Sequence, residues 1–313
     1  DHVDIETCSL CQMRCPMCFQ TVRDDVNNGM MDMDLFKDLM AQVARHKPYS
    51  IRLSWRGECL LHPRFSEMLD HARDVYSGNI SFITNGLKLD EALFRQLIER
   101  RIDYIVISAD GLGDTYQAVR SPGRFNALVE KLTLLRDMKR EKRSRFPMVR
   151  INGVSLWFAG EELEQFRRVF APLTDKILVG GVLNNFKALP PRHDPDRVCA
   201  SPWQRLLVSF CGTVHPCCDD YLGLYPLGDA KVQPLADIWR GRPAQEIRRL
   251  MRRRRRLDNP LCSAMDCGID ENPNEEDDAF MELMRAQARS GGERLAGLLP
   301  YLRTKGPGEG DGR

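Results

Sequence analysis

Residues 3–18 read VDIETCSLCQMRCPMC, a short β-like run followed directly by four cysteines within eleven residues. The run VDIE predicts a strand, and thiols gathered this closely in one loop indicate a metal centre rather than core packing. Four thiolates could close a structural metal site, whereas three could leave one coordination position open for chemistry. The stretch therefore predicts a strand that ends in a metal-binding loop, and it leaves the ligand set open.

Further along the chain, β-like runs alternate with amphipathic helices as far as about residue 183. Strands are predicted at 3–6, 51–55, 80–84, 102–108, 148–156 and 176–183, and helices at 35–46, 65–76, 91–101, 125–140 and 162–170. Regular alternation of this kind implies a parallel sheet with right-handed crossovers. The predicted fold class is α/β, a partial (β/α)6 TIM-like barrel whose site lies at the carboxyl ends of the strands.

The pattern changes after this series. Residues 184–202 are rich in Pro, Asp and Arg and are typical of a linker, and RLLVSFCGTVHPC (205–217) predicts a hairpin with Cys211-Gly212 at its turn. We therefore expect a barrel over 1–190 and a small C-terminal α+β cap over 191–270. Residues 271–313 are expected to form a C-terminal helix and a disordered tail.

The composition narrows the class of protein. The chain has 313 residues, of which 42% are hydrophobic and 29% charged, with a formal net charge of +2. No global basic excess exists to neutralise phosphates, which argues against nucleic acid as an obligate partner. No apolar run approaches the length of a membrane span. Eleven cysteines in separate bunches suit metal sites better than a disulfide framework, so we expect a protein of the reducing cytoplasm.

Four arrangements compete for the first cysteine group. Zinc on Cys8, Cys11, Cys15 and Cys18 would leave only three residues between the two pairs, fewer than is usual. A bacterial ferredoxin run has different gaps. Four core cysteines so close in one loop would be unusual. The fourth arrangement uses Cys11, Cys15 and Cys18 in the spacing C-x3-C-x2-C and leaves Cys8 out.

Several motifs resemble one family, the radical S-adenosylmethionine (SAM) enzymes. The stretch IETCSLCQMRCPMC (5–18) is similar to their first strand and cluster loop, and RGECLLHP (56–63) resembles the GGEPLLHP segment after the second strand. FITNG (82–86) and VISADG (106–111) resemble the ends of the third and fourth strands, and YQAVRSPGRFNALVEKL (116–132) the segment that follows. The resemblance covers roughly residues 3–183.

This resemblance implies a radical chemistry. Cys11, Cys15 and Cys18 would hold three irons of a [4Fe–4S] cluster whose fourth iron binds SAM. An electron, delivered by a donor such as flavodoxin or ferredoxin, would cleave SAM to a 5′-deoxyadenosyl radical that abstracts a hydrogen atom from a substrate C–H bond. The resemblance places the SAM contacts at Glu58, Asn85, Ser108 and Arg120.

A second cysteine group follows the barrel. Cys199, Cys217, Cys262 and Cys267, with the segments GTVHPCC and LADIW, resemble the SPASM and shorter twitch extensions of radical SAM enzymes. The resemblance implies one auxiliary [4Fe–4S] cluster on these four thiols. A structural zinc with the same ligands is the alternative. Four residues separate Cys262 from Cys267, which is more than in the usual final cysteine pair of these extensions. The assignment of Cys267 as the fourth ligand is therefore in question.

Two residues depart from the family motif, and several thiols stay unassigned. Arg56 stands where the motif has its first Gly, and Cys59 stands where it has Pro. Cys59, Cys211 and Cys218 are candidate hydrogen-atom donors, of which at most one would act. The alternatives are that Cys59 packs as a small core residue and that Cys218 serves as a substitute ligand.

The resemblance extends to enzymes that modify carbohydrates and aminocyclitols in antibiotic pathways. Such a substrate would undergo either two-electron dehydrogenation or epimerisation, and Arg150 and Asn152, on one face of the fifth strand, are candidate substrate contacts. One rival is a peptide maturase or peptidyl epimerase. A rival from another class is a non-catalytic iron–sulfur or zinc scaffold that binds nucleic acid through Arg252–Arg256, although a solvated or internally paired face also accounts for that run.

Overall fold

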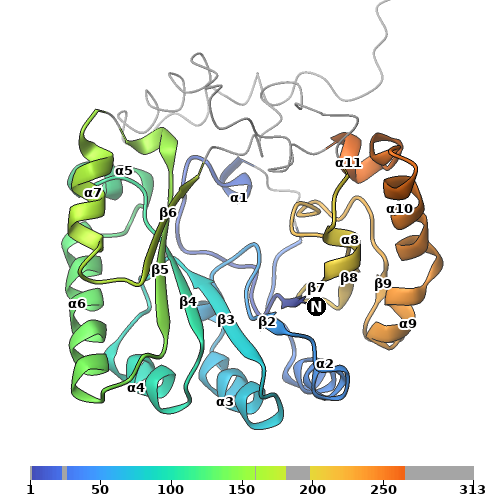
Figure 1. Cartoon of the computed structure of the whole chain (residues 1–313), viewed down its shortest axis with the longest axis horizontal. Coiled ribbons are helices and arrows are strands. Elements are labelled where there is room, and N and C mark those ends of the chain that lie inside the picture. Colours follow the sequence, from blue (N-terminus) through green and yellow to red (C-terminus); the bar gives the residue numbers. More distant parts are fainter. Residues whose placement is uncertain (1, 23–26, 159, 181–197, 265–313) are drawn as a thin grey trace, which may run out of the picture.

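A computed structural model describes residues 2–22, 27–158, 160–180 and 198–264. Its described strands form one sheet in the order β6-β5-β4-β3-β2-β1-β7-β8-β9 (Figure 1). The strands are β1 (His2–Ile5), β2 (Ser50–Arg52), β3 (Asn79–Thr84), β4 (Tyr104–Ser108), β5 (Met148–Val154), β6 (Lys176–Gly180), β7 (Arg205–Val208), β8 (Thr213–His215) and β9 (Gly228–Asp229). From β6 to β1 every pairing is parallel, which confirms the predicted alternation.

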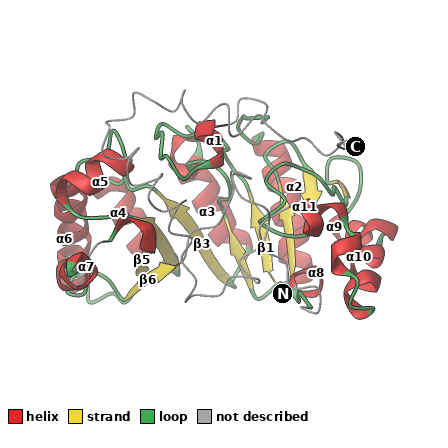
Figure 2. Cartoon of the chain, turned by 90° about the horizontal axis from the view of Figure 1, so that it is seen from above, coloured by secondary structure: helices red, strands yellow, loops and turns green. Residues whose placement is uncertain are grey.

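Helices follow the strands in the predicted order. They are α1 (Phe19–Val22), α2 (Met33–His46), α3 (Phe65–Val75), α4 (Glu91–Glu99), α5 (Gly113–Val119), α6 (Phe125–Glu141), α7 (Glu162–Phe170), α8 (Ser201–Gln204), α9 (Leu235–Arg240), α10 (Arg242–Arg252) and α11 (Pro260–Ala264). Both views place α6 and α7 at one end of the sheet and α9 and α10 at the other (Figures 1 and 2).

Local chemistry explains where these helices begin. Asp90 caps α4, because its Oδ1 accepts a hydrogen bond of 2.8 Å from the backbone N–H of Leu93. Asp32 caps α2 in the same way through the N–H of Asp34. Helix α2 therefore begins at Met33, two residues before the start at Leu35 that the sequence predicts.

The two faces of the strands have different environments. Ile51, Ile80, Phe82, Ile105 and Ile107 are fully buried in the cluster that packs the sheet against its helices. Because successive strand residues point to opposite faces, the side chains between them face the inside of the barrel. That inner set is largely polar and includes Asp4, Glu6, Arg52, Ser108, Arg150 and Asn152.

The predicted hairpin forms, and it also extends the barrel. Gly212, at φ 93°, occupies the turn between β7 and β8, a left-handed conformation that favours glycine. Strand β7 pairs in parallel with β1, from His2 with Arg205 to Ile5 with Val208. The cap is therefore not a separate sheet, and the carboxyl end of β7 reaches the same edge of the sheet as the loop after β1.

Some expectations fall outside the described residues. The boundary near residue 190, the end of the sixth predicted strand at 181–183, and the helix and tail expected in 271–313 all lie there. Among the helices that the structure describes, none combines the length and the apolar character that a membrane crossing requires.

Candidate active site

The first cysteine loop lies across the carboxyl ends of the neighbouring strands. Gly57 allows this close approach, because a Cβ there would stand 2.3 Å from the backbone carbon of Ser9. The N–H of Glu58 then donates to the carbonyl of Leu10 at 2.8 Å. Asn85, at the end of β3, donates from Nδ2 to Cys11 Sγ at 3.8 Å. The loop is thus held against β2 and β3.

The three predicted cluster ligands come together in this loop. The N–H of Cys18 donates to the carbonyl of Cys15 at 2.9 Å, which turns the chain between the two thiols. Burial, together with the neighbouring charges of Cys15 and Cys11, raises the pKa of Cys18 to about 11. Burial also raises the pKa of Cys11 and Cys15. Three such thiolates need a cationic centre to be stable together, which fits a metal cluster.

The described residues contain no three His, Cys, Asp or Glu side chains that could together hold a single metal ion. Each thiolate of a [4Fe–4S] cube binds a different iron, so its ligands do not converge on one point. The spread of Cys11, Cys15 and Cys18 is therefore compatible with a cube. Cys8 is fully buried and donates to the carbonyl of Leu10 at 3.8 Å, as expected for a packed thiol.

Glu58 is the centre of a buried polar network. Its Oε1 accepts from the N–H of Leu60 at 3.1 Å and from Thr84 Oγ1 at 2.7 Å, and its Oε2 accepts from the N–H of Asn85 at 2.6 Å. Burial raises the pKa of Glu58, although these hydrogen bonds oppose the rise. A carboxylate has about four acceptor positions, so Oε2 can accept another donor such as an ammonium.

Arg120 lies beside the cluster loop but is already paired. Its Nε donates to Asp110 Oδ2 at 2.6 Å, and Asp110 Oδ1 accepts from the N–H of Val154 at 2.6 Å. Burial alone would lower the pKa of Arg120, but Asp110 and Cys15 outweigh it and hold that pKa above its usual value. The motif match identified Arg120 and missed its anchor, Asp110, which the VISADG motif contains.

The inner face of β5 carries two unsatisfied polar atoms. Arg150 Nε and Asn152 Oδ1 are buried and have no hydrogen-bond partner among the described residues. The Arg150 guanidinium carbon lies 5.5 Å from the centre of the Tyr104 ring on β4. Ser108, also on β4, is in register with Asn152. A buried donor and a buried acceptor without partners are the features expected of a polar ligand site.

The second cysteine group is only partly visible in the described residues. Burial raises the pKa of Cys217 well above its usual value, and Asp219, Cys218 and Cys262 add to the rise. Cys217 and Cys262 are thus close enough to interact. Cys199 precedes α8, where its sulfur accepts from the N–H of Ser201 at 3.4 Å. Cys267 lies outside the described residues.

An aromatic contact joins the two cysteine groups. The rings of Phe19 and Tyr221 are 4.5 Å apart, and with Leu261 they form a buried cluster. Cys18 and Cys217 both pack against this same cluster. The first ligand loop and the second ligand region are therefore neighbours, which sequence reading did not predict because the three cluster residues are far apart in the chain.

Arg56, the departure from the family motif, connects the barrel to the hairpin. It forms a buried ion pair with Glu6, with Nη2 to Oε2 at 2.7 Å and Nε to Oε1 at 2.9 Å. Its Nη1 donates to the carbonyl of Tyr221 at 3.3 Å, and the N–H of Phe210 donates to Glu6 Oε2 at 3.2 Å. The Arg56–Glu6 pair therefore holds two turns of the cap, at Phe210 and at Tyr221, against the end of β1. No partner for Arg56 could be predicted from its motif.

The three spare thiols have different surroundings. Cys59 is fully buried in the main core, and its sulfur donates to the carbonyl of Ile83 at 3.4 Å. The sulfur of Cys218 accepts from Arg205 Nη1 at 3.3 Å. Cys211 is half-buried; burial would raise its pKa, but hydrogen bonds with Ser209 and Thr213 hold that pKa below its usual value.

The arginine run divides by exposure. Arg252 to Arg255 are exposed, and Arg255 pairs with Asp258, whereas Arg256 is fully buried. The acidic stretch at 270–278 that follows the run in the sequence lies outside the described residues. The run is therefore partly solvated and partly internal, which agrees with the interpretation of a solvated or internally paired face.

The site and the fold together define a class of protein. Residues 5–156 match the Radical SAM superfamily, and residues 199–268 match the SPASM family, an iron–sulfur cluster-binding domain. The chain is a radical SAM enzyme with a C-terminal SPASM domain. It binds SAM and a [4Fe–4S] cluster through the first domain and iron–sulfur through the second. The family and the cofactors predicted from the sequence are thereby confirmed.

Two curated relatives resemble the chain. A tungsten-containing aldehyde ferredoxin oxidoreductase cofactor-modifying protein of Pyrococcus furiosus is 29% identical over 188 residues, which are 58% of this chain and 51% of that protein. The chain thus spans about half the length of this relative. The S-adenosyl-L-methionine-dependent 2-deoxy-scyllo-inosamine dehydrogenase of Niallia circulans is 23% identical over 271 residues, covering 83% of this chain and 90% of that enzyme.

Two solved structures resemble the fold. BtrN in complex with AdoMet and 2-DOIA aligns with a TM-score of 0.60 and 18% identity, covering 85% of this chain and 92% of that chain. Streptococcus suis SuiB bound to the precursor peptide SuiA aligns with a TM-score of 0.64 and 12% identity, covering 78% and 65%. At these identities the likeness is one of fold, and it confirms the partial barrel.

Proposed function

We propose that this protein dehydrogenates a small polyhydroxylated ring, a carbohydrate or an aminocyclitol of the aminoglycoside type. The relative from Niallia circulans, which is named for such a reaction and is matched over 90% of its length, supports the substrate class. The observation that carries the reaction type is the shared packing of Cys18 and Cys217 on the Phe19–Tyr221–Leu261 cluster. Dehydrogenation requires an electron acceptor close to the radical site, and the packing of Cys18 and Cys217 against one cluster supports such an arrangement.

The ligand sets follow from the same proposal. Cys11, Cys15 and Cys18 hold the SAM-binding cluster, and Cys199, Cys217, Cys262 and Cys267 hold one auxiliary cluster. When bound, SAM and its cluster supply the 5′-deoxyadenosyl radical that removes a hydrogen atom from the substrate. Glu58 accepts a hydrogen bond from the SAM ammonium through Oε2. Asn85, Ser108 and Arg120 contact the rest of SAM, with Arg120 fixed in place by Asp110.

The substrate is held by the inner face of β5. Arg150 donates from its unpartnered Nε and Asn152 accepts at its unpartnered Oδ1, so the pair matches the hydroxyl groups of a ring polyol. A secondary alcohol that loses one hydrogen atom, one further electron and one proton becomes a ketone. Phe19, Tyr221 and Leu261 exclude water from the space between the two ligand regions, because their side chains are buried there.

Epimerisation is the competing outcome, because it needs only a thiol that returns a hydrogen atom. Cys59 is sealed in the core on the helix side of the sheet, so we do not retain it as a donor. Cys218 is engaged by Arg205, and Cys211 by two hydroxyl groups. Cys211 and Cys218 are the remaining candidates should a thiol act.

Product mass distinguishes the two outcomes. The reconstituted enzyme, supplied anaerobically with SAM, a reductant such as flavodoxin and 2-deoxy-scyllo-inosamine, is expected to form a product lighter by two hydrogen atoms. A product of unchanged mass in H2O that gains one deuterium in D2O would establish epimerisation instead. In that case Cys211→Ala or Cys218→Ala should stop product formation while SAM cleavage continues.

Metal content tests the wider proposal. About eight irons per chain, with matching sulfide, are expected for two cubes. Zinc or a single iron would contradict both the ligand assignment and the reaction. Turnover of a peptide, without turnover of any carbohydrate or aminocyclitol, would instead support a peptide-modifying enzyme. SuiB, whose structure was solved with a bound precursor peptide, has a similar fold.

A further inference from the structure

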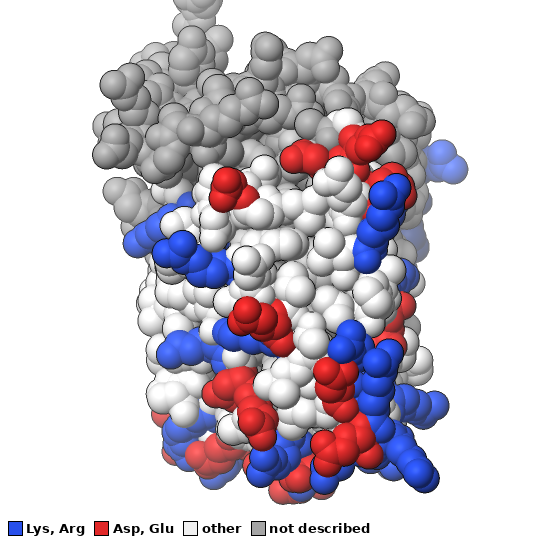
Figure 3. All heavy atoms as spheres, turned by 90° about the vertical axis from the view of Figure 1, so that its left-hand side faces the viewer, with Lys and Arg blue, Asp and Glu red and all other residues white. Residues whose placement is uncertain are grey.

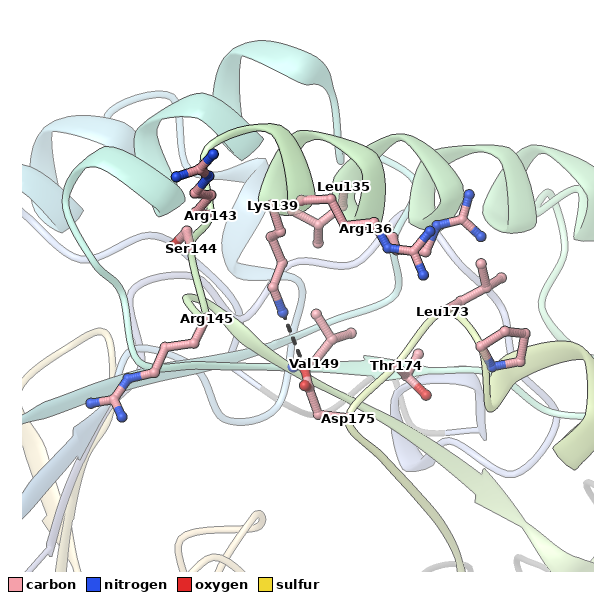
Figure 4. A pocket seen from close by; sticks show the side chains of 12 residues that line it. Leu135, Arg136, Lys139, Arg143, Ser144, Arg145, Val149, Leu173, Thr174 and Asp175 are labelled. Atoms are coloured by element: carbon pink, nitrogen blue, oxygen red, sulfur yellow. Dashed lines mark hydrogen bonds and ion pairs between the residues drawn. The ribbon is translucent and has the colours of Figure 1, made fainter.

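A cavity of about 340 Å³ lies outside the active site, at the opposite edge of the sheet (Figure 4). The last turns of α6, the loop 143–145 and the loop 172–175 surround it. These loops lead into β5 and β6, so the cavity lies at the amino ends of the strands, whereas the cysteine loop lies at their carboxyl ends. Its volume is within the usual range for a small-molecule site.

The residues around this cavity are strongly cationic. Five basic side chains line it, and Asp175 is the one carboxylate among the lining residues; the five are Arg136, Lys139, Arg140, Arg143 and Arg145. On the side of the molecule that α6 and α7 cover, Lys and Arg side chains lie interspersed with Asp and Glu (Figure 3), so the excess of positive charge is a feature of the cavity lining rather than of the whole face. Because like charges repel, such a group is most stable with an anion beside it.

The available carboxylates are already engaged. Asp175 Oδ2 accepts from the N–H of Val149 at 2.7 Å and from Lys139 Nζ at 3.3 Å. Arg136 forms an ion pair with Asp137 at 2.8 Å. The Asp137 carboxylate attracts Arg140 only through longer-range electrostatics, without an ion pair. Among the described residues Arg140, Arg143 and Arg145 take part in no ion pair. Three guanidinium groups on one rim thus lack a counter-charge.

The helix dipole accounts for only part of this group. The helix dipole stabilises a cation in the last turn of a helix, and the effect falls off beyond that turn. Lys139 and Arg140 are in the last turn of α6, but Arg143 and Arg145 follow its end. The excess of positive charge in the loop therefore has no explanation in the helix itself.

The backbone that carries these cations is fixed. Arg143 has a φ of 49°, and the N–H of Ser144 donates to the carbonyl of Lys139 at 2.9 Å, which closes the end of α6. Ser144 Oγ donates to the carbonyl of Phe146 at 3.0 Å. The Arg145 guanidinium carbon lies 4.8 Å from the centre of the Phe146 ring. Arg143 and Arg145 are thus carried by a hydrogen-bonded turn at the end of α6.

We propose that this cavity binds a small molecule bearing phosphate groups, at a site distinct from the active site. Guanidinium groups match phosphate oxygens in two-point hydrogen bonds, and among the described residues no carboxylate forms an ion pair with Arg140, Arg143 or Arg145. Leu135, Val149 and Leu173 provide an apolar floor for the rest of the ligand. Lys139 reaches from α6 across the cavity to Asp175 and stands within it (Figure 4).

The test uses inorganic pyrophosphate as the probe and the fully reconstituted enzyme, with binding measured by calorimetry. Saturable one-to-one binding is expected. Replacing Arg140, Arg143 and Arg145 together by Gln should weaken it about a thousandfold, and Arg140→Gln or Arg145→Gln alone about tenfold, since each lost charged hydrogen bond weakens binding by about tenfold. The matched control replaces Arg252, Arg253 and Arg254, which are exposed, by Gln and removes the same charge.

The outcomes decide the proposal. Weakened binding in the cavity variant and unchanged binding in the control would support it. Equal weakening in both variants would show attraction to net charge alone and overturn it, and so would the absence of saturable binding in the natural protein. Iron content and SAM cleavage should stay unchanged in the single variants, which shows that a loss of binding does not come from misfolding and does not depend on the proposed dehydrogenase reaction.

Discussion

The two cysteine regions of this enzyme are assembled in different ways. Cys11, Cys15 and Cys18 lie within eight residues of one loop, and the turn between Cys15 and Cys18 is local. Cys217 and Cys262 are separated by 44 residues and meet only because β7 and β8 extend the sheet and α11 returns to them. Local spacing therefore specifies the first site, and long-range packing specifies the second. Substitutions in the two regions should fail in different ways.

The largest effect is expected from Cys15→Ala. Removing one of three ligands should abolish SAM binding at the cluster, so 5′-deoxyadenosine formation should fall to background and about half of the iron should be lost. Chromatography of the nucleoside products and an iron assay measure both. Cys8→Ala is the matched control in the same loop, because Cys8 is packed rather than assigned as a ligand. Equal loss in both variants would contradict the three-ligand assignment.

Cys217→Ala should impair the second cysteine region while leaving the first one functional. About half of the iron should be lost here as well, but SAM cleavage should continue while oxidised product is no longer formed. Measuring deoxyadenosine and product in the same reaction gives the ratio between them. Cys218→Ala, at the adjacent position, should leave that ratio unchanged if dehydrogenation is the reaction. Loss of SAM cleavage in Cys217→Ala would show that the two sites are not independent.

Arg56→Gln tests the connection between the regions. Breaking a buried ion pair leaves Glu6 without its partner, which should destabilise the fold by about 3 kcal/mol. Hydrogen exchange should increase most at residues 209–221, the turns that Arg56 and Glu6 hold. Arg64→Gln is the control, because the exposed Arg64–Glu67 pair should contribute nothing measurable. Unchanged exchange at 209–221 would mean that other contacts hold the cap.

A smaller effect is expected at the aromatic contact. Tyr221→Leu keeps an apolar side chain but removes the ring pair with Phe19, which should cost about 1 kcal/mol. Thermal unfolding of the reconstituted enzyme measures this, and the ratio of product to deoxyadenosine should fall if the contact keeps the regions together. Phe158→Leu, which removes a ring pair with Phe166 at the far end of the barrel, should cost about as much without changing that ratio.

Much of the barrel could be predicted from the sequence. The alternation of strands and helices and the turn at Gly212 are local features, and each appears where expected. Glu58 and Arg120 could be identified because their motifs follow strand ends. Their partners Thr84 and Asp110 could not be assigned, because a hydrogen bond between segments depends on the register of neighbouring strands.

The sequence by itself determined the chemistry of this protein, because the cluster loop needs only a strand, a turn and three thiols at short spacing. Only the tertiary structure decided which distant residues act together. The parallel pairing of β7 with β1, the Arg56–Glu6 pair and the Phe19–Tyr221 contact all join segments far apart in the chain. The surroundings of each spare thiol were also decided there, because burial depends on every element packed around it.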